Sequence, residues 1–179
     1  MVTTCYNVCK WPEKRGESMI CAFTGHRPEK LPWGNREEDP RCAALKQQIA
    51  LAVERAVLAG AGVFACGMAR GCDFYFAEAV LSAKEKRPGL ELEAWLPCQG
   101  QSARWPRQDQ NRYERLLARC DRVILVEREY SDGCMLRRNR AMLDRADRLI
   151  SVYSGGGGGT GQAVAYAKSR GLFIDRLWL

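Results

Sequence analysis

The sequence predicts an α/β protein, a Rossmann-like three-layer sandwich in which helices cover both faces of a mainly parallel sheet of about six strands. Short apolar runs rich in β-branched and aromatic residues alternate along the chain with longer runs whose apolar residues recur at helical spacing. Glycine, proline and polar residues separate the two kinds of run. Strands that alternate with helices in this way form parallel sheets with helices on both faces.

Each expected strand is a short, mostly apolar run, as is typical of strands that are buried on both faces. The fifth such run leads directly into glycines, and a proline follows the third. The expected strands cover residues 19–23, 63–66, 92–96, 122–126, 148–153 and 172–177.

Each expected helix carries an apolar stripe and ends at a glycine, a proline or a polar turn. In the first helix Leu45, Ile49 and Val53 share one face, and Gly60 ends it. The proline-rich segment before this helix is long enough to act as a flap. The expected helices cover residues 43–59, 74–86, 108–119 and 135–146, and a last helix lies between Thr160 and Gly171.

The length of 179 residues suits one domain, and we expect a flexible tail over residues 1–17 and a single domain over residues 18–179. The tail lacks the apolar core of a signal peptide, and no run is as long and apolar as a membrane helix. We therefore expect a cytoplasmic protein without membrane contact, whose nine cysteines stay reduced. Cys5 and Cys9 resemble half of a metal site, but no second pair matches them and His26 is the only histidine, so we expect no metal.

The net charge of +7 favours anionic ligands, including nucleic acid. Much of the excess is arginine in the second half of the chain, and arginine suits planar contacts with phosphate. The alternative is that these side chains only keep the surface soluble. They are Arg104, Arg107, Arg112, Arg115, Arg119, Arg122, Arg128, Arg137, Arg138 and Arg140.

The most informative stretch is the run of five glycines, Gly155 to Gly159, between the fifth expected strand and the last helix. Bare backbone allows a ligand to approach closely, and the N–H groups and dipole at a helix start favour an anion, usually phosphate. Thr160 is the expected helix cap. Because the loop joins two well-patterned elements, it is not typical of a flexible linker.

Two more expected strands end in polar loops that contain glycine. Residues 24–28 (Thr-Gly-His-Arg-Pro) follow the first strand, and residues 67–73 follow the second. Asp73 is the expected cap of the next helix. Ligands of open α/β sheets bind beyond the carboxyl ends of the strands, so three such loops on one edge predict a phosphate-binding site there.

These loops resemble the SLOG superfamily, which joins the DNA-processing protein DprA with the "lonely guy" phosphoribohydrolases. Gly67-Met68-Ala69-Arg70-Gly71-Cys72-Asp73 resembles the Gly-x-Ala-x-Gly-x-Asp turn of the DprA family, and Arg138-Asn139-Arg140 resembles its Arg-Asn-Arg. Residues 24–28, Pro97 through Gln101 to Trp105, and Gly158-Gly159-Thr160 are most similar to the YpsA-like branch. The resemblance covers residues 19 to about 177 and implies loops that bind a nucleotide or a nucleotide-derived ligand, without a settled reaction.

One departure from the phosphoribohydrolases bears on catalysis. Their motif is Gly-Gly-x-Gly-Thr-x-x-Glu, and here the position of the glutamate falls on Ala163, beside Gln162. Neither side chain ionises, so neither can act as a general acid or base in glycosidic cleavage. We therefore expect binding without cleavage; an enzyme would need another carboxylate, and Asp73 and Asp132 are the loop candidates.

For several side chains the sequence leaves two interpretations open. His26, Arg27 and Arg70 are candidates for contact with the ligand. The alternatives are a loop histidine bonded to backbone for His26, a solvated charge for Arg27 and simple exposure for Arg70. Arg138 and Arg140 are two residues apart on one helix, so one of them faces the ligand and the other faces solvent or a partner subunit. Asn139 is a candidate to hold a loop carbonyl. Aromatic residues in the loops either stack on a base or cover the sheet edge, and they are Trp33, Trp105 and Tyr130.

We therefore expect a sensor or regulatory protein that binds a mononucleotide, ADP-ribose or dinucleotide, requires no cofactor, and can form a homo-oligomer. One alternative is an N-glycosidic hydrolase with a different carboxylate. The other is DprA-like binding of single-stranded DNA, with strong salt dependence. The expected ligand-binding residues are Thr24, Gly25, His26, Arg27, Gly67, Met68, Ala69, Arg70, Gly71, Asp73, Arg138, Asn139, Gly157, Gly158, Gly159 and Thr160.

Overall fold

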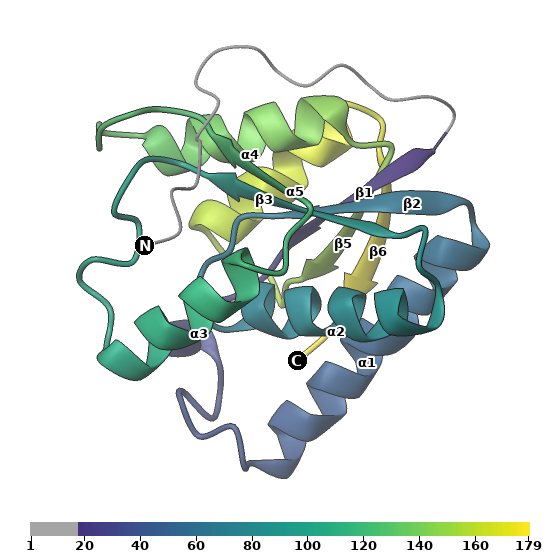
Figure 1. The fold of residues 1–179 in the computed structure, drawn as a ribbon, viewed down its shortest axis with the longest axis horizontal. Coiled ribbons are helices and arrows are strands. Elements are labelled where there is room, and N and C mark those ends of the chain that lie inside the picture. Colours follow the sequence, from purple (N-terminus) through teal and green to yellow (C-terminus); the bar gives the residue numbers. More distant parts are fainter. Residues whose placement is uncertain (1–17) are drawn as a thin grey trace.

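The computed structural model describes residues 18–179 as a six-stranded parallel sheet between two layers of helices (Figure 1). Every expected element forms, with ends shifted by a few residues. The strands are β1 (Met19–Thr24), β2 (Ala61–Cys66), β3 (Glu91–Leu96), β4 (Arg122–Leu125), β5 (Arg148–Val152) and β6 (Phe173–Leu177). The helices are α1 (Pro40–Leu58), α2 (Cys72–Lys86), α3 (Arg107–Leu117), α4 (Cys134–Arg145) and α5 (Gly159–Ser169), with a 3-10 turn η1 (Pro28–Lys30).

Helix α1 begins earlier than the apolar stripe predicts because the turn before it supplies its own start signal. Pro40 occupies the first turn, where its missing N–H costs nothing. The Asp39 carboxylate accepts a hydrogen bond of 2.9 Å from the Arg41 N–H and caps the helix.

The strand order β4-β3-β2-β1-β5-β6 creates a topological switch point between β1 and β5. From β1 the chain proceeds outward through β2, β3 and β4, and then returns to the other side of β1 to add β5 and β6. All neighbours are parallel, so the loops after β1, β2 and β5 leave from the same edge. Crevices at such a point are the usual ligand sites of open α/β sheets.

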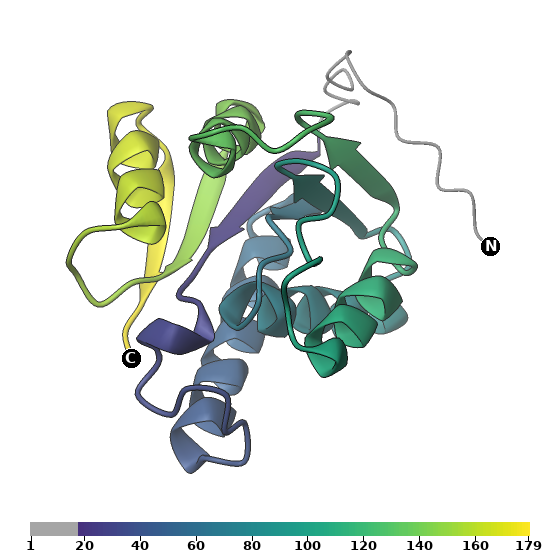
Figure 2. The same ribbon diagram turned by 90° about the vertical axis from the view of Figure 1, so that its left-hand side faces the viewer.

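Each face of the sheet carries its own apolar core. Figure 2 shows the helices that cover the two faces. Helices α1, α2 and α3 cover one face, where Phe23 and Phe76 stack with ring centroids 4.4 Å apart. Helices α4 and α5 cover the other face, and Ala163 of α5 is buried there. The seven cysteines of residues 18–179 are unpaired, and only Cys120 among them is more than slightly exposed.

Candidate functional site

Three loops meet at the switch point and are bonded to one another. The Thr160 hydroxyl, from the start of α5, donates a 3.1 Å hydrogen bond to the Gly25 carbonyl after β1. The Cys72 N–H, from the start of α2, donates a 3.2 Å bond to the His26 carbonyl. The loops after β1, β2 and β5 therefore form one surface at the carboxyl edge of the sheet.

These contacts correct both predicted helix caps. Helix α5 follows Gly158 and α2 follows Gly71, and no side chain of the described residues caps either helix. Thr160 lies inside the first turn of α5, and its hydroxyl bonds to the neighbouring loop instead. Asp73 lies inside the first turn of α2, and its carboxylate accepts a 3.0 Å bond from the Ala69 N–H in the loop before it. Thr160 thus bonds to a distant loop and Asp73 to the loop just before its own helix, and neither bonds to the free N–H groups of its helix.

The glycine loop is open to an incoming ligand. Gly155, Gly156 and Gly158 have φ values of +104°, +86° and +97°, a region that side chains rarely adopt. A Cβ built on Gly157 or Gly159 would meet no other atom within 4 Å. Residues 154–159 are exposed, so the uncapped N–H groups at the start of α5 lie next to an exposed loop.

Lys30 from the loop after β1 reaches across to the glycine loop. Its ammonium donates a 3.1 Å hydrogen bond to the Gly157 carbonyl. This contact brings a positive charge to the expected phosphate position. No sequence motif marks Lys30 as a site residue. The only signal for it in the sequence was its position, four residues after His26 in a loop that follows an expected strand.

His26 lies between the loops and is only 4% exposed. Its Nε2 atom is 3.4 Å from the Ser154 hydroxyl, while Nδ1 has no hydrogen-bond partner in residues 18–179. Burial and then the nearby Lys30 charge lower the pKa of His26 below its ordinary value. The ring is therefore neutral at pH 7 and can accept a proton or a hydrogen bond.

Arg138 from α4 lies beneath the loop after β2. The residue is 4% exposed, and its guanidinium donates a 2.8 Å hydrogen bond to the Trp95 carbonyl. A Cβ on Gly67 would overlap this guanidinium, so a larger residue there would have to displace it. Arg138 thus supports the loop from below, whereas Arg140 is exposed and lies over the Tyr166 ring.

Asp73 shares this buried region with Arg138. Burial raises the pKa of Asp73 to about 6, although the Arg138 charge and the Ala69 N–H act in the opposite direction. Because this value lies above the ordinary 3.8, the folded protein holds the proton more tightly than the unfolded chain does. The contribution of Asp73 to stability is therefore full below about pH 4 and is lost as the pH rises through about 6.

We expect Asp73→Asn to remove this pH dependence. Between pH 4 and pH 6.5 the wild-type free energy of unfolding should fall by roughly 2 kcal/mol relative to that of the variant. Urea denaturation of both proteins across this range measures the difference. Carboxylates with lowered pKa values, such as that of Glu127, are common to both proteins and cancel in the comparison. Parallel curves would contradict the assignment.

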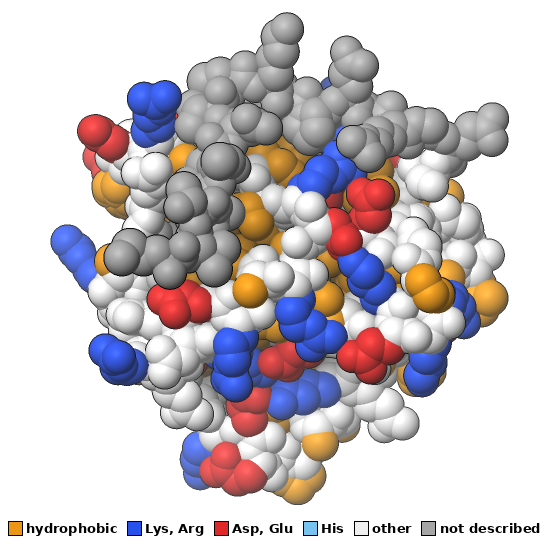
Figure 3. All heavy atoms as spheres, viewed as in Figure 1, with side chains coloured by type: hydrophobic (Ala, Val, Ile, Leu, Met, Phe, Trp, Pro, Cys, Tyr) orange, Lys and Arg blue, Asp and Glu red, His pale blue; other side chains and the backbone are white. Residues whose placement is uncertain are grey.

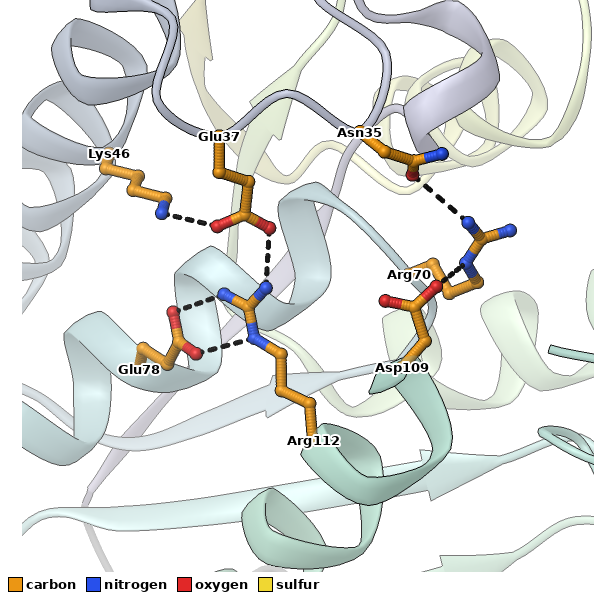
Figure 4. Close-up of polar contacts among 7 residues, drawn as sticks. All are labelled: Asn35, Glu37, Lys46, Arg70, Glu78, Asp109 and Arg112. Carbon is orange, nitrogen blue, oxygen red and sulfur yellow. Dashed lines mark hydrogen bonds and ion pairs between the residues drawn. The ribbon is translucent and has the colours of Figure 1, made fainter. Parts of the chain in front are cut away.

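Arg70 is held by polar partners on three sides. Its guanidinium bonds to Glu29 (2.9 Å), Asn35 (3.1 Å) and Asp109 (2.6 Å). Figure 4 shows it beside the Asn35 and Asp109 side chains. The interpretation of Arg70 as a simply exposed charge is therefore wrong, and its guanidinium is already paired where we expected a ligand contact.

A second cluster of ion pairs holds the proline-rich segment that we expected to act as a flap. Arg112 of α3 bonds to Glu78 of α2 and to Glu37 of this segment, and Lys46 of α1 also bonds to Glu37 (Figure 4). Trp33 in the same segment is 3% exposed. The segment is thus packed down onto α1, α2 and α3.

The three loop aromatic residues that could stack on a base lie elsewhere: two pack within the protein and the third is exposed away from the switch point. Trp33 is in the core and cannot stack on a ligand. Trp105, just before α3, packs edge-on against Phe74 and Tyr113. Tyr130 is 69% exposed, but it follows β4 at the edge of the sheet, far from the switch point in strand order.

The side chains of Gln101, Met68 and Asn139 differ in what they contact. The Gln101 amide donates to the Gly67 and Met68 carbonyls at 3.2 and 2.9 Å, so it steadies the loop after β2. Met68 has a left-handed backbone (φ 51°) and a fully buried side chain, so only its backbone can meet a ligand. Asn139 is half-buried, and within residues 18–179 its side chain bonds to no loop carbonyl.

The sheet, its switch point and the glycine loop define a Rossmann-like α/β protein. A family model described as the YspA SLOG family matches residues 21–169. The chain therefore belongs to this SLOG family, which confirms the resemblance to the YpsA-like branch.

Relatives of the chain include a UPF0398 protein of Bacillus pumilus (strain SAFR-032). It is 27% identical over 136 residues, which are 75% of this chain and 73% of that protein. The SPbeta prophage-derived protein YoqJ of Bacillus subtilis (strain 168) is 29% identical over 127 residues, 64% of this chain and 74% of that protein.

Two solved structures of DNA processing protein A share the fold. The protein from Streptococcus pneumoniae has a TM-score of 0.60 and 14% identity, over 89% of this chain and 50% of that one. The protein from Helicobacter pylori, which binds single-stranded DNA, has a TM-score of 0.61 and 17% identity, over 88% of this chain and 64% of that one. The chain thus spans about half of the first protein and less than two thirds of the second.

Two searches of the described residues gave negative results. No helix within residues 18–179 is long and apolar enough to cross a membrane. In the same part of the chain, no group of three His, Cys, Asp or Glu side chains is placed to hold a metal ion. Cys5 and Cys9, the half-site considered above, lie outside the described residues.

Proposed function

We propose that this protein binds a nucleotide or a nucleotide-derived ligand at the switch point between β1 and β5, as a sensor or regulatory protein. The observation that carries the proposal is the open glycine loop at the uncapped start of α5. Its backbone N–H groups and the helix dipole provide a place for a phosphate. Membership of the SLOG family supports the same choice of ligand class.

The charges around the loop support an anion. Lys30 already touches the Gly157 carbonyl, and Arg27 is exposed on the adjacent loop. His26 is neutral and offers a hydrogen bond without a charge. Arg138 adds a positive field from beneath the loop after β2, and its burial limits it to that role.

Two alanine variants, one at the start of α5 and one away from the site, test the proposal. A Cβ at Gly161 would lie 2.6 Å from the Gly156 carbonyl oxygen and displace the glycine loop, whereas a Cβ at Gly89, before β3, meets nothing within 4 Å. ADP-ribose at a hundred times its dissociation constant should add about 2.7 kcal/mol to the stability of the wild type. We expect Gly89→Ala to keep this increase and Gly161→Ala to lose it, as thermal denaturation with and without ligand will measure. Equal increases in both variants would count against the loop as the phosphate site.

Binding of single-stranded DNA is the second candidate, because a DprA protein that binds such DNA shares the fold. The charge distribution favours it less. Arg112, Arg119 and Arg137 are paired with glutamates. On the face drawn in Figure 3, basic and acidic side chains are interspersed and form no single basic patch. A steep fall of oligonucleotide affinity with salt would favour this candidate over a small nucleotide.

A further inference from the structure

A row of planar groups runs along the edge of the glycine loop, where β5 and β6 end. The His26 and Tyr153 ring centroids are 6.1 Å apart. The Arg176 guanidinium lies over the Tyr153 ring at 5.0 Å and over the Trp178 ring at 3.6 Å. Arg176 Nε also donates a 2.8 Å bond to the Tyr153 carbonyl, which fixes the guanidinium in place. The row ends at Trp178.

Trp178 is a largely exposed aromatic side chain. It is 58% exposed although the Arg176 guanidinium lies over its ring. The other tryptophans of residues 18–179, at positions 33, 95 and 105, are buried or half-buried. A large, exposed ring in contact with a cation is suited to stack on a planar group of a ligand.

The row of planar groups is bonded to the phosphate loop. The Tyr153 hydroxyl donates to the Gly156 carbonyl. A Cβ at Gly161, in the first turn of α5, would lie 3.0 Å from the same hydroxyl. One rigid set of contacts therefore joins the glycine loop to the row that ends at Trp178.

We propose that Trp178 stacks on the base of a ligand whose phosphate occupies the glycine loop. This inference rests on the proposed function and adds the class of group at the other end of the ligand, a planar nucleobase. Stacking requires only the π face of a base, so the site tolerates different bases. A free nucleotide and a single-stranded DNA both present this chemistry, and the experiment separates them.

The test compares ligands with and without a base. Isothermal titration measures AMP, ribose 5-phosphate and a short oligo-dT against the wild type, Trp178→Ala and Trp178→Phe. We expect Trp178→Ala to weaken AMP about tenfold or more while the affinity for ribose 5-phosphate stays within twofold. Trp178→Phe should recover most of the loss. Quenching of tryptophan fluorescence by AMP should disappear in Trp178→Phe, because that variant lacks the stacked indole.

The matched control is Phe173→Ala, at the start of the strand that Trp178 follows. Phe173 is 62% exposed and has the Arg148 guanidinium at 4.7 Å, but it lies at the amino end of β6. We expect this variant to bind all three ligands as the wild type does. A selective loss of oligo-dT binding in Trp178→Ala would assign the base to DNA, and a selective loss of AMP binding would assign it to a nucleotide.

Two results would overturn the inference and leave the proposed function intact. One is that Trp178→Ala binds both AMP and oligo-dT as the wild type does, and the other is an equal loss for AMP and ribose 5-phosphate, which would mean that Trp178 only shapes the phosphate loop. If the wild type binds none of the three ligands and does not bind ADP-ribose either, the proposed function itself fails.

Discussion

Replacing Gly25 by alanine should lower the free energy of unfolding by about 3 kcal/mol. A Cβ at this position would overlap the Cβ of Cys72 and lie 3.0 Å from the Phe23 ring. Neither neighbour can yield easily, because Cys72 and Phe23 are fully buried and a Cβ is fixed to the backbone. Gly25 therefore allows the loop after β1 to cross the start of α2, and chemical denaturation of the variant measures what that crossing contributes.

Gly89→Ala is the control for this prediction, since a Cβ there meets nothing within 4 Å. Its stability should remain within about 0.5 kcal/mol of the wild type. The double variant Gly25→Ala with Cys72→Gly should recover part of the loss, because it removes the overlapping atom. Similar denaturation midpoints for the two single variants would show that the loops are not in close contact.

The protein should release adenine from AMP at less than about 0.01 per second, a thousandfold below a typical turnover of about 10 per second. Cleavage of the glycosidic bond needs a carboxylate near the developing cationic sugar. The position that supplies it in the phosphoribohydrolases is Ala163, which is 1% exposed and lies on the buried face of α5, against the sheet. Gln162 beside it is exposed and does not ionise. The absence of this carboxylate accounts for the expected thousandfold reduction in rate.

Chromatography of AMP incubated with micromolar protein measures this rate. Asp132 follows β4 at the edge of the sheet, so it is poorly placed to replace the missing carboxylate. Asp73 lies nearer the switch point and has a pKa of about 6, which suits proton transfer. Adenine released at an enzymatic rate, and lost in Asp73→Asn, would show that the protein is an enzyme that uses Asp73.

The local elements of this fold were predictable because their signals are local. Apolar runs, helical spacing and the residues at helix ends depend on neighbours within a few positions. The alternation of strands and helices then required parallel pairing, which brings the ends of β1, β2 and β5 to one edge. The position of the candidate site followed from that edge before any strand order was known.

The sequence by itself thus determined the α/β class, the order of elements and the edge that carries the loops. Only the tertiary structure decided that β1 and β5 are neighbours, which places Thr160 against Gly25 and Ser154 beside His26. It also redirected Asp73 and Thr160 from helix caps to loop contacts, and it paired Arg70 with Asp109. Apart from the contact of Asp73 with Ala69, these partners lie far apart in sequence. Their choice depends on how the layers pack as a whole, and no local pattern of residues records it.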